Sequence, residues 1–164
     1  MTEIDLAQRA ADILQKNIYA NIATSGVDGP WNTPATALAD AELNFYWSSW
    51  VNAVHSKNVI GNGLAFLTFF DSTRARGTNN KMCLYLQCAA SEVTDPAEAR
   101  KAFELLYPDE AVELKAFLDG GIKRFYKATP KTAWLNSLSE RELEPSTLKM
   151  RVEVSLADIQ RLRN

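Results

Sequence analysis

The sequence predicts a single domain, residues 1–164, built as a small, mostly antiparallel β barrel with helices at its periphery. Three β-rich segments in the first half are joined by tight turns, which is typical of antiparallel strands. A nearly continuous apolar run, Leu64–Phe70, has the length of a buried strand. In total about six or seven strand-like segments accompany a few helical ones, which favours a barrel with helices covering its ends.

The chain begins with a predicted helix and a predicted hairpin. An apolar stripe predicts a helix over 2–16, with Thr2 as its N-cap and Asp5 completing a capping box. Asp28-Gly29 is a strong hairpin signal. The two strands of this hairpin are Ile18–Thr24 and Trp31–Ala39. Pro34 removes one backbone donor from the second strand, so we expect an edge or a bulge there.

The remaining elements are predicted from periodicity and turn residues. The strands are Leu43–Ser48, Leu64–Phe70, Met82–Val93, Ile122–Ala128, Thr132–Leu138 and Thr147–Val154. The helices are Ala53–Gly61, one starting at Asp95-Pro96, Asp109–Leu118 and Leu156–Arg163. Because Leu64–Phe70 is apolar at almost every position, we expect it to be buried on both faces.

Composition excludes several classes of protein. The 18 Lys and Arg against 20 Asp and Glu give a net charge of −2, which has the wrong sign for binding nucleic acid by bulk charge. Cys83 and Cys88 are expected to be unpaired core residues, and with one histidine no zinc site is expected. The acidic N-terminus lacks the features of a signal peptide, and no apolar stretch is long enough to span a membrane. We therefore expect a cytoplasmic protein.

The segment 47–58 is the best candidate for a binding site. It places hydroxyls, the only imidazole and one ammonium where a strand ends and a short helix begins. Free N–H groups at a helix start, hydroxyl donors and a lysine together suit a phosphate group. Two structural alternatives remain: His55-Ser56-Lys57 as an ordinary solvated helix start, and Trp31, Trp47 and Trp50 as core rather than as a stacking platform.

The order of these segments resembles the pyridoxamine 5′-phosphate oxidase-like family, the FMN-binding split barrels. The resemblance covers roughly residues 4 to 106 and depends on the ordered series rather than on one motif. Its strongest parts are Ser56-Lys57 and the step from strand to helix at Asp95-Pro96-Ala97-Glu98. It implies a six-stranded antiparallel split barrel that works as a homodimer, with FMN at the subunit interface.

The resemblance also implies site residues, in three groups. The second strand would line the flavin with Asn32, Thr33, Pro34 and Ala35. The third strand and the next helix would hold ribityl and phosphate with Trp47, Ser48, Ser49, His55, Ser56 and Lys57. The loop before the long strand, at Asn80, Lys81 and Met82, would reach the partner's flavin. No metal ligand and no catalytic side chain is implied, since the flavin carries the electron chemistry.

The chain departs from true pyridoxamine phosphate oxidases, which carry an arginine on the second strand and an Arg-Lys pair in the phosphate segment. Here these positions are Asn32-Thr33 and Ser56-Lys57, and no second histidine follows. The expected function is an FMN-dependent oxidoreductase acting on an unidentified small molecule, and these departures count against vitamin B6 oxidation. The alternatives are a flavin-binding or sensor protein without turnover, and the same barrel holding F420 or haem, with His55 as the haem ligand.

Overall fold

The structure is a computed structural model that describes residues 2–73, 75–76, 82–108, 112–118, 120–136 and 151–163. Its strands are β1 (Tyr19–Gly26), β2 (Gly29–Thr36), β3 (Leu38–Ala39), β4 (Phe45–Trp50), β5 (Leu64–Phe70), β6 (Cys83–Glu92), β7 (Lys123–Asn136) and β8 (Arg151–Val154). Its helices are α1 (Glu3–Lys16), α2 (Val54–Asn62), α3 (Pro96–Leu106), the 3-10 helix η2 (Leu114–Phe117) and α4 (Leu156–Arg163).

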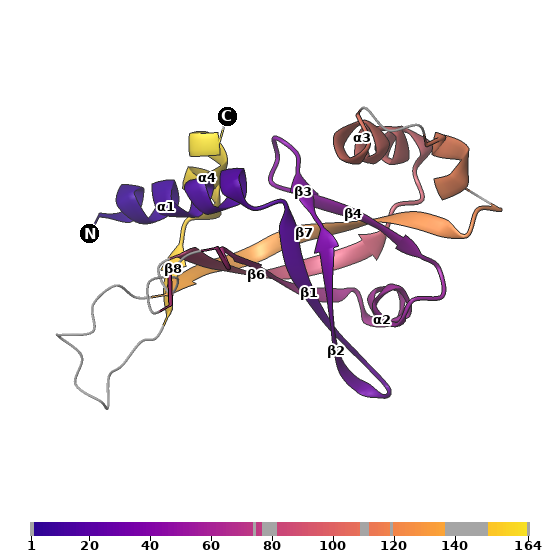
Figure 1. Cartoon of the computed structure of the whole chain (residues 1–164), viewed down its shortest axis with the longest axis horizontal. Helices are drawn as coiled ribbons and strands as arrows, with labels where there is room; N and C mark the ends of the chain where they lie inside the picture. Colours follow the sequence, from indigo (N-terminus) through magenta and orange to yellow (C-terminus); the bar gives the residue numbers. More distant parts are fainter. Residues whose placement is uncertain are drawn as a thin grey trace.

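One antiparallel sheet organises the described part of the chain. Its strand order is β2-β1-β5-β6-β7-β4-β3, and β8 pairs with β7. The sheet curls until the edge strand β2 contacts β4, so the six long strands form a split barrel to which β3 and β8 are short additions. α1 and α4 lie side by side at one end of the sheet, and α3 lies at the other end (Figure 1).

Two hydrophobic clusters stabilise this arrangement. The larger fills the barrel, where Trp47, Phe69 and Leu86 are fully buried and α1 contributes Ile13. The smaller lies beneath α3 and η2 and centres on Phe117, which stacks on Phe125 of β7 with ring centroids 4.5 Å apart. β7 therefore contributes to both cores, and the second cluster fixes α3 relative to the sheet.

The local signals at the helix ends are confirmed. Thr2 caps α1, and its hydroxyl and the Asp5 carboxylate form the reciprocal hydrogen bonds of a capping box. Asp95 caps α3, with Pro96 in the first turn. α2 ends at Gly63, whose φ of 70° lies in the left-handed region that glycine adopts without strain. The Asp28-Gly29 turn joins β1 to β2, and Pro34 lies on the edge strand as expected.

Three expectations need correction. The predicted strands 122–128 and 132–138 are one strand, β7, as far as the structure describes them, to Asn136: Pro130 pairs with Cys88, and a bulge at Lys131, between this pair and the Gln87–Thr132 pair, lets the strand continue. β5 is not buried on both faces: Leu67 and Phe69 are buried, whereas Leu64 on the other face is 57% exposed. Of the helix predicted over 109–118, the structure describes only a 3-10 turn at 114–117, and 109–111 lie outside the described residues.

Cys83 and Cys88 are both free and buried, as expected for core residues. Burial raises the pKa of both thiols, which keeps them protonated at neutral pH. Within the described ranges, no helix combines the length and the apolar character that crossing a membrane requires.

Candidate functional site

The start of α2 offers unpaired backbone donors beside a lysine. β4 ends at Trp50, and after a three-residue turn α2 begins at Val54. The N-cap residue, Ala53, has no side chain that could accept from the first-turn N–H groups. The first turn contains no acidic residue, and the side chain of Lys57 is exposed directly after it. This helix start can therefore receive an anion on its N–H groups, with Lys57 as the counter-charge.

A hydrogen bond connects this helix start to the second strand. Thr33 Oγ1 of β2 lies 3.2 Å from His55 Nδ1 of α2. The same hydroxyl accepts from Trp31 Nε1 at 3.0 Å, which leaves its own hydrogen available for the imidazole. His55 is buried, and burial lowers the pKa of its imidazole, so the ring is neutral at physiological pH. Two groups of predicted site residues, 22 positions apart, thus meet in space.

Other predicted site residues differ widely in accessibility. Asn32 and Pro34 are exposed on the edge strand, and Ala35 and Ser48 are half-buried. Ser49 is buried, and Ser56 is fully buried. Trp31 and Trp50 are about half exposed, whereas Trp47 is fully buried and stacks on Tyr126 with centroids 5.7 Å apart. Of these three tryptophans, Trp31 and Trp50 are accessible enough to stack on a ligand ring, whereas Trp47 belongs to the core.

Three buried polar atoms of predicted site residues and their neighbours have no hydrogen-bond partner among the described residues: Trp47 Nε1 of β4, Ser56 Oγ of α2 and Tyr126 OH of β7. Ser56 Oγ faces the Tyr126 hydroxyl, but the two atoms do not adopt hydrogen-bonding geometry. Leaving such atoms unpaired costs free energy, so natural proteins satisfy most of them with water or a ligand. At the helix start, the Ser56 hydroxyl is therefore a hydrogen-bond donor without a partner among the described residues.

α2 is held against β1 by side-chain amides. Asn58 Nδ2 donates to Thr24 Oγ1 at 3.1 Å, and Asn62 Nδ2 donates to the Ser25 carbonyl at 2.7 Å. Gly26 lies so close to α2 that an added Cβ would be 2.1 Å from Asn58 Oδ1. The position of the helix start is therefore set by contacts with the hairpin β1–β2.

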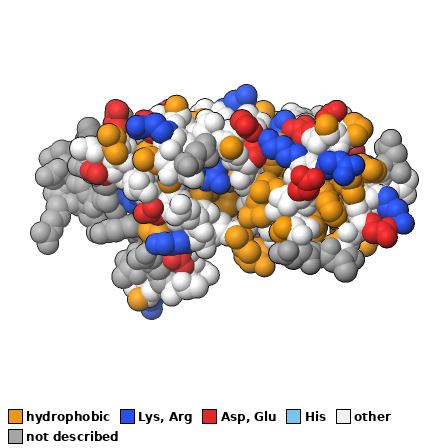
Figure 2. Space-filling view, turned by 90° about the horizontal axis from the view of Figure 1, so that it is seen from above, with side chains coloured by type: hydrophobic (Ala, Val, Ile, Leu, Met, Phe, Trp, Pro, Cys, Tyr) orange, Lys and Arg blue, Asp and Glu red, His pale blue; other side chains and the backbone are white. Residues whose placement is uncertain are grey.

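A cavity of about 570 Å³ lies between the end of α3 and the barrel, and we call it the α3 pocket. Its lining residues are Ile18, Tyr19, Ala35, Thr36, Leu38, Ser48, Leu105, Leu106, Tyr107 and Pro108. Seen from above, hydrophobic side chains gather toward this end of the molecule (Figure 2). Tyr107 OH lies 2.5 Å from Ser48 Oγ, so a residue that sequence reasoning missed contacts one that it predicted. No local pattern could have indicated this contact, because 59 positions separate the two residues.

Comparison with known proteins shows what this arrangement resembles. No known family profile matches the sequence, and no curated protein matches it. Among solved structures, a Clostridium acetobutylicum protein related to general stress protein 26 of B. subtilis, of the pyridoxinephosphate oxidase family, is similar over 97% of this chain and 99% of its own. Its TM-score is 0.63 and its sequence identity 16%. The chain has the pyridoxamine 5′-phosphate oxidase-like split-barrel fold.

Other split barrels with this fold bind different cofactors. HutZ, the haem storage protein from Vibrio cholerae, aligns with 15% identity over 76% of this chain and 89% of its own, at a TM-score of 0.61. An F420 reductase aligns with 18% identity over 74% of this chain and 93% of its own, at a TM-score of 0.55. Proteins with this fold thus include a haem storage protein and an F420 reductase, so the fold alone does not determine the ligand of this chain.

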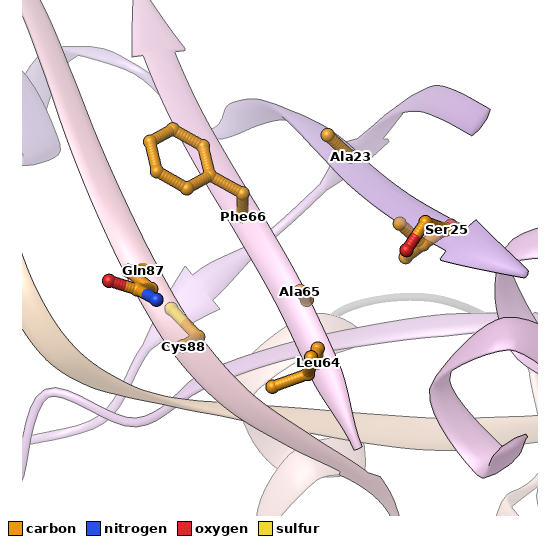
Figure 3. Close-up of a pocket in the computed structure, with 8 residues that line it drawn as sticks. Ala23, Ser25, Leu64, Ala65, Phe66, Gln87 and Cys88 are labelled. Carbon is orange, nitrogen blue, oxygen red and sulfur yellow. The ribbon is translucent and has the colours of Figure 1, made fainter. Parts of the chain in front are cut away.

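The outer face of the split barrel carries an aromatic cluster. Phe66 stacks on Trp134 with centroids 6.3 Å apart and lies 6.4 Å from Tyr85. The Arg151 guanidinium lies 3.8 Å from the centroid of Tyr85. Beside this cluster, strands β1, β5 and β6 line a shallow pocket of about 260 Å³, where Phe66, Leu64 and Gln87 are visible (Figure 3).

The loop before β6 was predicted to reach the partner's cofactor. Asn80 and Lys81 lie outside the described residues, and Met82 is buried in the main core. The structure therefore brings Thr33 of β2 to the α2 start, and it places Ala35 and Ser48 at the α3 pocket.

Proposed function

We propose that this chain binds FMN along β2 and at the start of α2, and uses it as an oxidoreductase acting on a small molecule. The observation that supports this most directly is the Thr33–His55 contact of 3.2 Å. It joins an exposed strand edge, suited to a flat ring, to a helix start suited to a phosphate. A flavin mononucleotide is a ligand with a planar ring at one end and a phosphate at the other.

The residues present fit this cofactor. In the proposal, the uncapped N–H groups of α2 and the Lys57 ammonium hold the phosphate, while Ser56 is fully buried and its Oγ faces Tyr126 in the core. On β2, Thr33 and Ala35 share one face, and they can line the ring beside the α2 start and the α3 pocket, whereas Asn32 and Pro34 are exposed on the other face of the strand. The neutral imidazole of His55 fixes Thr33 without adding charge near the ring. Bound flavin would supply the hydride and electron chemistry, while this chain binds, orients and shields it.

We further propose that a second copy of the chain covers the aromatic outer face. The face is continuous across β5, β6 and β7, and its side chains include Phe66, Tyr85 and Trp134. Leu64 at its edge is 57% exposed, and isologous burial of such a face is the usual basis of a two-fold dimer. In this dimer Asn80 and Lys81, which lie outside the described residues, would contribute to the partner's cofactor site, whereas Met82 belongs to the core of its own subunit.

Haem and F420 are the alternative cofactors. A histidine-ligated haem would need His55, because no other histidine exists in the sequence. His55 is buried and already bonded to Thr33 through Nδ1, an arrangement that favours a structural imidazole. A visible absorption spectrum of the freshly purified protein separates the three cofactors, and we expect the two flavin bands. A Soret band would replace the FMN proposal with haem, and a single deazaflavin band would replace it with F420.

The phosphate site is tested by titrating FMN into the parent and Lys57→Ala. A charge-assisted hydrogen bond to phosphate is worth about 1.5–3 kcal/mol, so the dissociation constant should rise roughly ten- to a hundredfold. Lys16→Ala, which removes another exposed lysine at the end of α1, is the matched control and should bind as the parent does. Equal dissociation constants for all three proteins would make Lys57 an ordinary solvated lysine.

A further inference from the structure

We propose that the α3 pocket binds a neutral, largely apolar small molecule. This inference deepens the proposed function, because the pocket shares Ala35 and Ser48 with the predicted flavin site and so adjoins the ring. A molecule held there would be the reaction partner of the flavin. The binding itself is a property of this pocket and can be measured with or without FMN.

The size and lining of the pocket define the ligand class. Its volume of about 570 Å³ is that of a small-molecule site. Aliphatic side chains, among them Leu38, Leu105 and Leu106, form much of its wall. None of the lining residues that the structure describes is Lys, Arg, Asp or Glu. A phosphate or carboxylate entering the pocket would lose its hydration and gain no cation in return, which makes charged ligands unfavourable.

One polar group can orient the ligand. Ser48 Oγ and Tyr107 OH share a hydrogen bond of 2.5 Å on the pocket wall, and the pair keeps one further hydrogen and free lone pairs for a ligand. The Tyr107 ring is fixed by Phe103 and Phe117, with centroids 5.8 Å and 5.2 Å away. A carbonyl, amide or hydroxyl on an otherwise apolar molecule can therefore be held in one orientation.

The charge preference is tested with two probes of equal shape, naphthalene-2-carboxamide and naphthalene-2-carboxylate, in calorimetric titrations. The carboxamide should bind at least roughly tenfold more tightly than the carboxylate. Ile18→Lys places a cation at the exposed rim of the pocket and should narrow or reverse this ratio. Ile4→Lys, at a similarly exposed isoleucine of α1, should leave the ratio unchanged. Equal or tighter binding of the carboxylate by the parent overturns the proposal.

Tyr107→Phe tests the orienting pair. It should weaken carboxamide binding roughly three- to tenfold, as the loss of one hydrogen bond predicts, and leave the binding of unsubstituted naphthalene unchanged. An equal loss for both probes would mean that the hydroxyl acts only through packing, which contradicts the orienting role.

Titrations with and without saturating FMN separate this inference from the proposed function. We expect the carboxamide to bind in both conditions. If FMN blocks it, the pocket is part of the flavin site and the inference is wrong. If FMN binds but neither naphthyl probe does, the inference fails while the proposed function stands. If the carboxamide binds to a chain that takes up no FMN, the inference stands and the proposed function fails.

Discussion

Asn58 of α2 occupies the space that a side chain at Gly26 would need. A Cβ atom at Gly26 would lie 2.1 Å from Asn58 Oδ1, while Asn58 Nδ2 bonds to Thr24 on the same strand. The end of β1 and the helix proposed to bind the cofactor are therefore in direct contact. The absence of a side chain at one position sets where the helix lies.

The first prediction concerns this contact. Gly26→Ala should displace the Asn58 side chain, break its hydrogen bond to Thr24 and lower the free energy of unfolding by about 1–2 kcal/mol. In the Asn58→Ala background the same substitution should cost much less, because the obstructing atoms are gone. Denaturant unfolding of the two single variants and the double variant measures this coupling. Additive costs would show that Gly26 and Asn58 act independently.

His55 gives the protein a pH-dependent stability. Burial lowers the pKa of its imidazole in the folded state below the usual value of about 6.5, so the unfolded chain binds more protons near that pH. Stability should therefore fall as the pH drops from about 6.5 toward the lower folded pKa. Denaturant unfolding of the parent without FMN, at pH values above and below the unfolded pKa of about 6.5, should show this decrease in the free energy of unfolding. His55→Gln should lack that component, and an identical pH dependence in the two proteins would contradict the assignment.

Lys101 stabilises a buried carboxylate. Its ammonium lies 2.8 Å from Asp40 Oδ2, and the Asp40 side chain is 4% exposed. Burial alone would raise the pKa of Asp40, but the bonds from Lys101 and Asn44 outweigh it, and the pKa is lowered. Lys101→Ala should lower the free energy of unfolding by about 1–3 kcal/mol, because it removes a partner of a buried charge.

The control for Lys101 is Lys115→Ala, which breaks the solvent-exposed pair with Glu113 and should change stability by less than about 0.5 kcal/mol. The stabilisation from Asp40 is present above the unfolded pKa of about 3.9 and is lost as the pH falls through its lower folded pKa. The difference between parent and Lys101→Ala should therefore shrink in that acidic range. A difference that persists below the folded pKa would mean that Lys101 acts through packing alone.

The outer face predicts the oligomeric state. The parent should sediment as a dimer at micromolar concentration, with an interface above about 2,000 Å², as obligate interfaces have. Leu64→Lys adds a charge at an exposed position of that face and should shift the protein toward monomer. Ile122→Lys, at a similarly exposed residue before β7, should leave the dimer intact. If the parent sediments as a monomer, the proposed dimer and the proposed cofactor site shared between two subunits are both wrong.

A nicotinamide test separates an enzyme from a binding protein. If one face of the flavin ring is open to a donor, NADH or NADPH should bleach the bound flavin anaerobically and air should restore it. Absorbance near the long-wavelength flavin band follows both steps. Trp31 and Trp50 are exposed aromatic residues that could cover the ring instead. Reduction by dithionite but by neither nicotinamide, with no turnover on a panel of acceptors, would favour a flavin-binding protein.

Local signals predict much of the fold. Thr2 with Asp5, Asp28 with Gly29, and Asp95 with Pro96 each determine a helix end or a turn through atoms a few residues apart. The errors arise where partners distant in sequence decide. Pro130 is typical of a strand break, but β7 continues because Pro130 pairs with Cys88 of β6 and a bulge follows at Lys131. The alternating burial of β5 likewise depends on what covers its outer face.

The candidate site also contains features that local sequence patterns predict and features that depend on residues far apart in the chain. The hydroxyls, the imidazole and the lysine of one short segment are enough to predict, from the sequence alone, a candidate binding site at the start of α2. The roles of Gly26 and Tyr107 depend on Asn58 and Ser48, which lie far from them along the chain. Patterns in a single sequence carry no information on such pairs, so they cannot predict the α3 pocket.

The segment between β6 and β7, which contains α3 and η2, can be exchanged without changing the pairing of these two strands. α3 and η2 leave the sheet after Glu92 and return at Lys123, while Glu92 and Tyr126 still pair across the two strands. Within the segment Phe117 packs on Phe103, and against the sheet it stacks on Phe125; the segment also contributes the far wall of the α3 pocket, so an exchanged segment has to keep an aromatic residue at position 117 and the partner of Asp40 at Lys101. Replacing this segment with the corresponding segment of another split barrel would therefore change which ligand the α3 pocket binds. The register between β6 and β7 would stay the same. Diversification within such a scaffold can proceed by exchanging one wall, with no need to redesign the sheet.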